Sequence, residues 1–92
     1  MKRQPEYSGQ FKRDVKLSQK RGKDISKLKA LLGLLIDGVP LPATYLDHRL
    51  QGGWKGFRDA HIESDWLLIY KIAGDDVVRF ERTGRHSDLF SE

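Results

Sequence analysis

The 92-residue chain has no cysteine, which excludes disulfide bonds and zinc sites built on thiolates. It also lacks a long apolar run: the longest, from Ala30 to Ile36, is interrupted by Gly33 and is far too short to span a bilayer. No apolar segment follows the charged residues at the N-terminus, so we expect neither a signal peptide nor a membrane partner. These features predict a cytoplasmic protein.

Acidic residues are scarce in the first third of the chain. Residues 1–30 hold ten lysines and arginines but only three acids, whereas residues 31–92 hold seven basic and ten acidic residues. A basic segment on a near-neutral body indicates a polyanionic partner. A lysine-rich, solvated helix face would give the same composition, so charge alone leaves both interpretations open.

The apolar spacing predicts one strand and two helices in the first 38 residues. The strand lies around Gln4–Tyr7. Pro5 cannot donate a ladder hydrogen bond, so this strand should lie at a sheet edge or start at the proline. Ser8 and Asp24 are the expected N-caps of the two helices, and Gly38 is expected to end the second helix. Only a few residues join the helices, so they should form an antiparallel hairpin.

Strand-forming residues dominate the second half of the chain. After a loop over residues 43–53, three segments are rich in aromatic and β-branched residues: Trp54–Ile62, Trp66–Ile72 and Val77–Thr83. Their short connections force antiparallel neighbours. We therefore predict an α+β fold of order β-α-α-β-β-β in a single domain over residues 1–92, with the helical hairpin on one face of a small antiparallel sheet. Residues 86–90 should form one helical turn.

All three histidines lie in this second half, beside an aspartate and an arginine. We expect five side chains to converge on one end of the sheet: His48, His61, Asp65, Arg82 and His86. RNA carries its own nucleophile, the 2′-hydroxyl, so its cleavage needs a base, an acid and positive charge near the phosphorus. Imidazole titrates near neutrality and suits the first two roles, and a guanidinium suits the third, without a metal.

Each of these residues also has a simpler interpretation. An isolated histidine is more often a hydrogen-bonding residue than a catalyst, Asp65 could cap the turn, and Arg82 could form an ion pair with a neighbouring acid. Phe90 and Trp66 could be core residues. We expect no metal site, because the histidine and aspartate near the turn lie on a hairpin rather than on a metal-binding helix. A glycine-rich phosphate loop and a nucleophile elbow are also absent.

Segments that carry a family resemblance run through nearly the whole chain. In the first half they are Glu6–Phe11, Asp14–Leu17, Leu41–Ala43, Asp47-His48 and Leu50–Gly52. In the second half they are Trp54–His61, Asp65-Trp66, Leu68–Lys71, Arg79–Gly84, His86 and Leu89-Phe90. This pattern resembles the RelE/ParE toxin superfamily, and specifically its YafQ branch. The run from Leu50 to His61, followed by Asp65-Trp66, is its most specific part.

The resemblance implies a ribosome-dependent, metal-independent endoribonuclease with a RelE-like fold and no cofactor. Toxins of this superfamily enter the ribosomal A site and cut the mRNA codon held there. A neighbouring gene encodes an antitoxin that holds the toxin inactive, and the pair represses its own operon. The resemblance therefore implies three partners: an acidic antitoxin, the ribosome with its mRNA, and operator DNA through the antitoxin complex only.

The resemblance also implies a set of site residues. The catalytic set is His48, His61, Asp65 and His86, and the residues assigned to substrate contact are Arg82, Phe90 and Trp66. His86 is the candidate general acid, and either Asp65 or a His61 oriented by it is the candidate base. Phe90 would stack on a base of the codon, as aromatic side chains do in single-stranded RNA recognition.

Cations on the two helices would hold ribosomal RNA phosphates: Lys12, Arg13, Lys16, Lys20, Arg21, Lys23 and Lys27. Two other functions remain open. A ParE-like toxin would share the fold and inhibit DNA gyrase, but such proteins generally lack the histidine and aspartate set. A non-catalytic ribosome- or RNA-binding module would use the same basic helices and would need no histidines.

Overall fold

A computed structural model describes residues 2–90 of the chain. Its strands are β1 (Gln4–Tyr7), β2 (His48–Arg49), β3 (Arg58–Glu63), β4 (Trp66–Ala73) and β5 (Val77–Gly84). Its helices are α1 (Gly9–Lys20), α2 (Ile25–Asp37) and α3 (His86–Leu89), with single 3₁₀ turns at Ala43–Tyr45 and Gly52–Trp54. The predicted α+β fold is confirmed, as is the helical turn that begins at His86.

The five strands form one sheet in the order β1-β5-β4-β3-β2. β5, β4 and β3 are antiparallel neighbours, as expected. β2 also pairs antiparallel with β3, but it lies inside the predicted loop over residues 43–53 and was not expected. β1 lies at an edge, as Pro5 predicts, but it runs parallel to β5, with Tyr7 opposite Phe80. Parallel neighbours need a long crossover connection. Here the helical hairpin between β1 and the later strands contributes to that crossover, so the sheet is mixed rather than wholly antiparallel.

Side-chain and glycine caps set the ends of the two long helices. The Ser8 hydroxyl accepts a hydrogen bond from the Phe11 backbone N–H at 2.9 Å, and the Asp24 carboxylate accepts one from Ser26 at 3.0 Å. Gly38 ends α2 with a φ of 73°, in the left-handed region that favours glycine. All three caps are those expected from the sequence.

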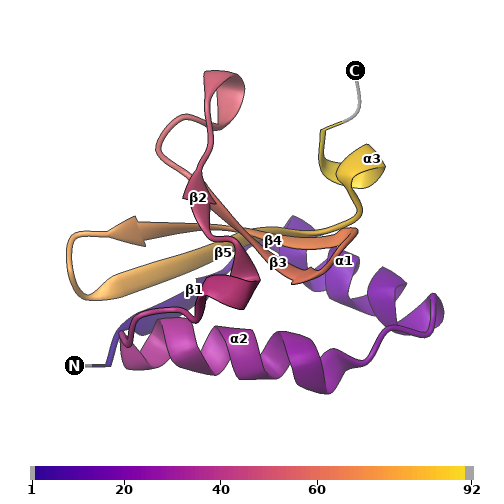
Figure 1. Cartoon of the computed structure of the whole chain (residues 1–92), viewed down its shortest axis with the longest axis horizontal. Coiled ribbons are helices and arrows are strands. Elements are labelled where there is room, and N and C mark those ends of the chain that lie inside the picture. The colour runs from indigo at the N-terminus through magenta and orange to yellow at the C-terminus, as the bar shows by residue number, and fades with distance from the viewer. Residues whose placement is uncertain (1, 91–92) are drawn as a thin grey trace.

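Both long helices cover the same face of the sheet (Figure 1). Their buried side chains and those of the sheet form the main core: Phe11, Leu28, Leu31, Leu35, Ala60, Trp66, Leu68, Tyr70, Val78 and Phe80. Within residues 2–90, no helix is long and apolar enough to cross a membrane.

The opposite face of the sheet carries the loop between β2 and β3 and the short helix α3 (Figure 1). A second, smaller apolar cluster lies there, made of Leu67, Ile69 and Leu89. The loop replaces the first part of the strand predicted from Trp54. The chain makes a 3₁₀ turn there, and Gly56 has a φ of 93°, so β3 begins only at Arg58.

Candidate active site

Four rings form a row on the face of the sheet opposite the long helices. The ring centroids of Phe90 and His86 are 6.2 Å apart, those of His86 and His61 are 5.9 Å apart, and those of His61 and His48 are 6.2 Å apart. The rings come from α3 and the residue after it, from β3 and from β2. The fold thus brings the three predicted histidines and Phe90 together; we call this set the ring row.

Strand pairing explains why the ring row forms. β2 pairs with β3 so that His48 lies opposite Asp59. Because alternate residues of a strand point to the same face, Asp59 and His61 share the face of His48. β4 returns beside β3 after the turn, and β5 returns beside β4, so α3 begins next to that turn. The β3–β4 and β4–β5 hairpins therefore place His86 next to His61.

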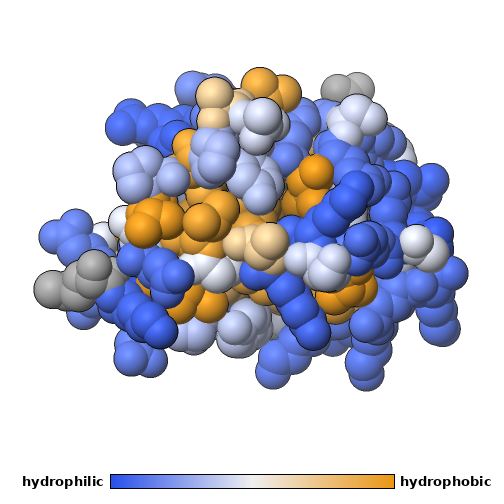
Figure 2. Space-filling view, turned by 60° about the horizontal axis from the view of Figure 1, so that its bottom comes forward, coloured by the Kyte–Doolittle hydropathy of each residue, from blue (hydrophilic) through white to orange (hydrophobic). Residues whose placement is uncertain are grey.

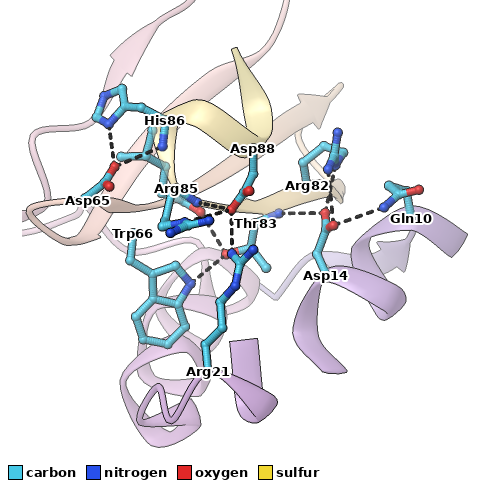
Figure 3. Close-up of polar contacts among 11 residues, drawn as sticks. Gln10, Asp14, Arg21, Asp65, Trp66, Arg82, Thr83, Arg85, His86 and Asp88 are labelled. Atoms are coloured by element: carbon cyan, nitrogen blue, oxygen red, sulfur yellow. Dashed lines mark hydrogen bonds and ion pairs between the residues drawn. The ribbon is translucent and has the colours of Figure 1, made fainter. Parts of the chain in front are cut away.

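Asp65 fixes His86 at the start of α3 (Figure 3). One carboxylate oxygen accepts hydrogen bonds from the His86 backbone N–H and from Nδ1 of its ring, each at 2.9 Å. Because a carboxylate only accepts, this contact assigns the Nδ1 proton to His86 and leaves Nε2 on the other side of the ring. The backbone and ring hydrogen bonds lower the pKa of Asp65. Asp65 therefore orients His86, not His61 as one reading of the sequence suggested.

Asp59 belongs to the site but was not predicted. Its side chain is buried, with Oδ1 3.0 Å from Nδ1 of His48 and 3.9 Å from Nε2 of His61. The Nδ1 of His48 also lies 2.9 Å from the Leu46 carbonyl oxygen. Burial raises the pKa of Asp59, and the histidines nearby oppose that rise. The alternation Asp59-Ala60-His61 was the sequence signal that could have found it.

Two residues assigned to substrate contact lie elsewhere. Trp66 is 1% exposed and its indole N–H donates to the Thr83 hydroxyl at 3.0 Å, so the prediction that it contacts substrate is wrong and the core interpretation holds. Arg82 donates to the buried Asp14 carboxylate, with Nε 2.8 Å and Nη2 3.2 Å from its oxygens (Figure 3). Asp14 also accepts from the Thr83 N–H and from Gln10. Arg82 thus tethers α1 to β5 rather than standing free for a phosphate.

The seven predicted helical cations divide into two groups. Arg21 pairs with Asp88 at 2.7 Å, and Lys23 and Lys27 both pair with Glu63, at 3.0 and 2.9 Å. These three cations form ion pairs within the chain, with Lys23 and Lys27 sharing the single charge of Glu63. The remaining cations have no acidic partner among residues 2–90: Lys12, Arg13, Lys16 and Lys20.

Residues 3–91 match the profile of a family described as the YafQ bacterial toxin of type II toxin–antitoxin systems. The chain belongs to the YafQ family. It is 62% identical to the mRNA interferase toxin YafQ of Escherichia coli strain K12 over 91 residues, which cover 98% of both chains. The resemblance inferred from the sequence is therefore confirmed.

Solved structures agree with this assignment. The crystal structure of the E. coli DinJ–YafQ toxin–antitoxin complex contains a chain with 61% identity and a TM-score of 0.91, covering 99% of this chain and 100% of that one. A metal-bound toxin from Helicobacter pylori is 38% identical, with a TM-score of 0.87 over 98% of this chain and 100% of that one.

The ring row of this YafQ family member is flanked by a hollow. A cavity of about 300 Å³ opens beside His61 and is also lined by Lys27, Thr44 and Tyr45. Tyr45 supplies an aromatic face, and Thr44 a hydroxyl that can donate or accept. The site therefore combines rings that can exchange protons with a neighbouring space lined by polar and aromatic groups.

Proposed function

We propose that the chain is an mRNA interferase toxin, an endoribonuclease that cleaves mRNA on the ribosome until an antitoxin neutralises it. The observation that carries this proposal is the ring row, in which three imidazoles lie side by side and one is held by a carboxylate. The names of the relatives support the same activity, since the E. coli protein is an mRNA interferase toxin. A gyrase inhibitor or a simple RNA-binding module would need no such row.

The chemistry begins with the 2′-hydroxyl of the nucleotide before the scissile bond. A base removes its proton, the 2′-oxygen bonds to phosphorus, and the bond from phosphorus to the 5′-oxygen breaks. A proton then goes to that 5′-oxygen, which leaves a 2′,3′-cyclic phosphate and a 5′-hydroxyl end. Base and acid act on opposite sides of the phosphate, and two imidazoles with centroids 5.9 Å apart suit that division.

We assign the acid to His86. Its Nδ1 is bonded to Asp65, so the proton for the leaving oxygen comes from Nε2 of the imidazolium. The base is then His61 or His48, each of which faces the buried Asp59. Phe90, in contact range of His86, is placed to stack on a base of the codon. Asp59 and Asp65 act as positioning residues in this scheme.

Surface features support the ribosome and the antitoxin as partners. The unpaired cations of α1 suit ribosomal RNA phosphates. Figure 2 shows hydrophobic side chains gathered in the middle of the face turned forward from the bottom of Figure 1, with hydrophilic side chains around them. An apolar patch with a polar rim is typical of a protein-binding surface. We infer that the antitoxin covers this face.

The test is to map mRNA 5′ ends on translating ribosomes after adding the purified chain. His86→Ala should lower the cleavage rate at least about 100-fold, because general acid catalysis supplies that much. Ser87→Ala, its exposed neighbour, is the matched control and should cleave normally. Cleavage by His86→Ala at a near-normal rate would contradict the acid assignment. Intact mRNA with inhibited gyrase supercoiling would favour the ParE-like alternative instead.

A further inference from the structure

We propose that a hollow beside β2 holds one nucleotide of the RNA strand that is being cut, with its phosphate on Arg49 and Lys55. This inference rests on the proposed function and assigns a further contact to the same substrate. The hollow has a volume of about 530 Å³ and is lined mainly by residues 49–58. Most of this segment belongs to the most specific part of the sequence pattern, yet the proposed chemistry uses none of its side chains.

The start of β3 explains why the hollow exists. β4 continues to Ala73, but its pairing with β3 reaches only Tyr70, opposite Arg58. The chain before Arg58 turns at Gly56, whose φ of 93° lies in the left-handed region that favours glycine. Ile72 therefore has no neighbour from β3 and lines the hollow instead. The space suits a nucleotide, since ligand pockets hold roughly 300–1,000 Å³.

Positive charge surrounds the hollow. Arg49 and Lys55 are exposed and have no acidic partner in the described part of the chain. Arg58 differs, because its Nε and Nη2 donate to the Asp47 carboxylate, which fixes the guanidinium and leaves Nη1 for another acceptor. No described acidic residue lines the hollow. Two unpaired cations beside a fixed guanidinium suit the oxygens of a phosphate.

Apolar side chains supply the rest of the lining. Leu50, Phe57 and Ile72 are half-buried and border the hollow. Trp54 packs edge-on against Phe57, with ring centroids 5.4 Å apart, so the Phe57 ring is held in place without a ligand. In the recognition of single-stranded RNA, bases pack on aromatic and apolar side chains while cations follow the backbone. The lining therefore fits a whole nucleotide better than a phosphate alone.

The hollow adjoins the ring row at the edge of the sheet. β2 is the outermost strand, and its Arg49 directly follows His48 and lies opposite Arg58 of β3. Consecutive residues of a strand point to opposite faces, so His48 and Arg49 lie on either side of this edge. An RNA strand that passes round the edge contacts both. This position favours the RNA that is being cut, rather than the acidic antitoxin, as the occupant.

The experiment measures single-turnover cleavage on ribosomes that carry a full mRNA or an mRNA truncated just before or just after the codon that is cut. On the full mRNA, the double variant Arg49→Gln and Lys55→Gln should need at least about tenfold more ribosomes for the half-maximal rate, the size of a hydrogen bond to a charged group. Its rate constant at saturation should not change. On one of the two truncated mRNAs, the double variant and the parent chain should be equal, because the bound nucleotide is missing.

A matched control removes the same amount of charge elsewhere. Lys2 and Lys29 are exposed and lie outside the hollow. The double variant Lys2→Gln and Lys29→Gln should therefore cleave all three mRNAs as the parent chain does. Circular dichroism checks that both double variants are folded.

A second measurement does not depend on cleavage. His86→Gln is bound to ribosomes whose mRNA carries photoreactive thiouridine beside the codon, and mass spectrometry maps the crosslinks. We expect them on residues 49–58, and we expect them to disappear when Arg49→Gln and Lys55→Gln are added. Such crosslinks from a parent chain that cleaves no mRNA would leave the nucleotide site standing and contradict the proposed function.

Three results would overturn the proposal. Normal cleavage and normal crosslinks in the double variant Arg49→Gln and Lys55→Gln would mean that the hollow binds no RNA. A loss of equal size on all three mRNAs would mean that the nucleotide belongs to ribosomal RNA. Normal cleavage together with weakened antitoxin binding would assign the hollow to the antitoxin.

Discussion

At the scale of the residue, Asp59 is a carboxylate whose burial opposes its ionisation, while the nearby histidines favour it. Its carboxylate is 3% exposed and lies against two imidazoles, and one oxygen makes no hydrogen bond within residues 2–90. Burial raises the pKa of Asp59, so the folded state binds its proton more tightly than the unfolded state does. The ionised form therefore destabilises the fold at every pH above that raised pKa.

Replacing this charge should stabilise the protein. We expect Asp59→Asn to raise the free energy of unfolding at pH 7 by roughly 1 kcal/mol, the usual size for relieving an unsatisfied buried group. The gain should shrink as the pH falls through the pKa of Asp59, where the native carboxyl is itself neutral. Urea unfolding at a series of pH values measures this difference, and RNA cleavage by the variant should decrease at the same time.

Asp75→Asn, which removes an exposed carboxylate from the turn between β4 and β5, is the matched control and should leave stability unchanged. A loss of stability in Asp59→Asn at pH 7 would mean that His48 and His61 hold the carboxylate in its charged form more strongly than burial opposes it.

The residues of the site were predictable to different degrees. The three histidines and Asp65 stand out by type, and the two hairpins that join β3, β4 and β5 bring His86 next to His61. Asp59 alternates with His61 along β3, but its pairing with His48 could not be predicted, because the two-residue strand β2 is too short to show a period. Trp66 was misplaced because alternation along β4 turns it toward the helices.

At the scale of the element, α3 decides where the proposed acid lies. A four-residue helix is not stable alone, so other contacts must hold it. Asp88 accepts hydrogen bonds from Arg21 of α1 at 2.7 Å and from the Arg85 backbone N–H at 3.0 Å (Figure 3). These hydrogen bonds lower the pKa of Asp88. A side chain at Gly84 would meet the Asp88 carboxylate at 3.1 Å, so α3 packs closely on the end of β5.

Arg21 should therefore act through α3 and not through RNA. A partly exposed ion pair contributes up to about 1 kcal/mol, so Arg21→Ala should lower the cleavage rate constant roughly fivefold. Its affinity for ribosomes should change little. Lys20→Ala is the matched control: we expect weaker ribosome binding and an unchanged rate constant at saturation. Single-turnover cleavage over a range of ribosome concentrations separates the two effects, and identical behaviour of both variants would contradict this role.

Elements set by local signals were predicted well. The caps of α1 and α2 are side-chain contacts within a few residues, and the sequence contains them in full. The parallel pairing of β1 with β5 joins residues more than 70 positions apart, as in Tyr7 and Phe80, and no local pattern carries that information. The sequence also did not predict that the loop between β2 and β3 continues to residue 57. Its conformation depends on Gly56, whose backbone is in the left-handed region.

At the scale of the whole molecule, the fold divides the helical cations of the described chain into those with an acidic partner and those without one. From the sequence alone, all seven helical cations had the same predicted role, contact with RNA phosphates. In three dimensions Lys23 and Lys27 share Glu63, while Lys12, Lys16 and Lys20 follow one another at four-residue intervals along one side of α1 without an acidic partner in the part of the chain that the structure describes. A spacing of four gives one charged stripe on a helix. We expect that stripe to carry the electrostatic share of ribosome binding.

Salt dependence tests this division of charge. Each phosphate contact adds about 0.7–0.9 to the slope of log affinity against log salt concentration. A variant with Lys12→Gln, Lys16→Gln and Lys20→Gln should therefore bind ribosomes more weakly at low salt and lose about two units of slope. The matched double variant Lys23→Gln and Lys27→Gln should lose less, because the single charge of Glu63 already offsets one of these two charges. Equal losses of slope per charge in both variants would mean that the internal ion pairs open when the chain meets RNA, and that the whole basic segment acts as one surface.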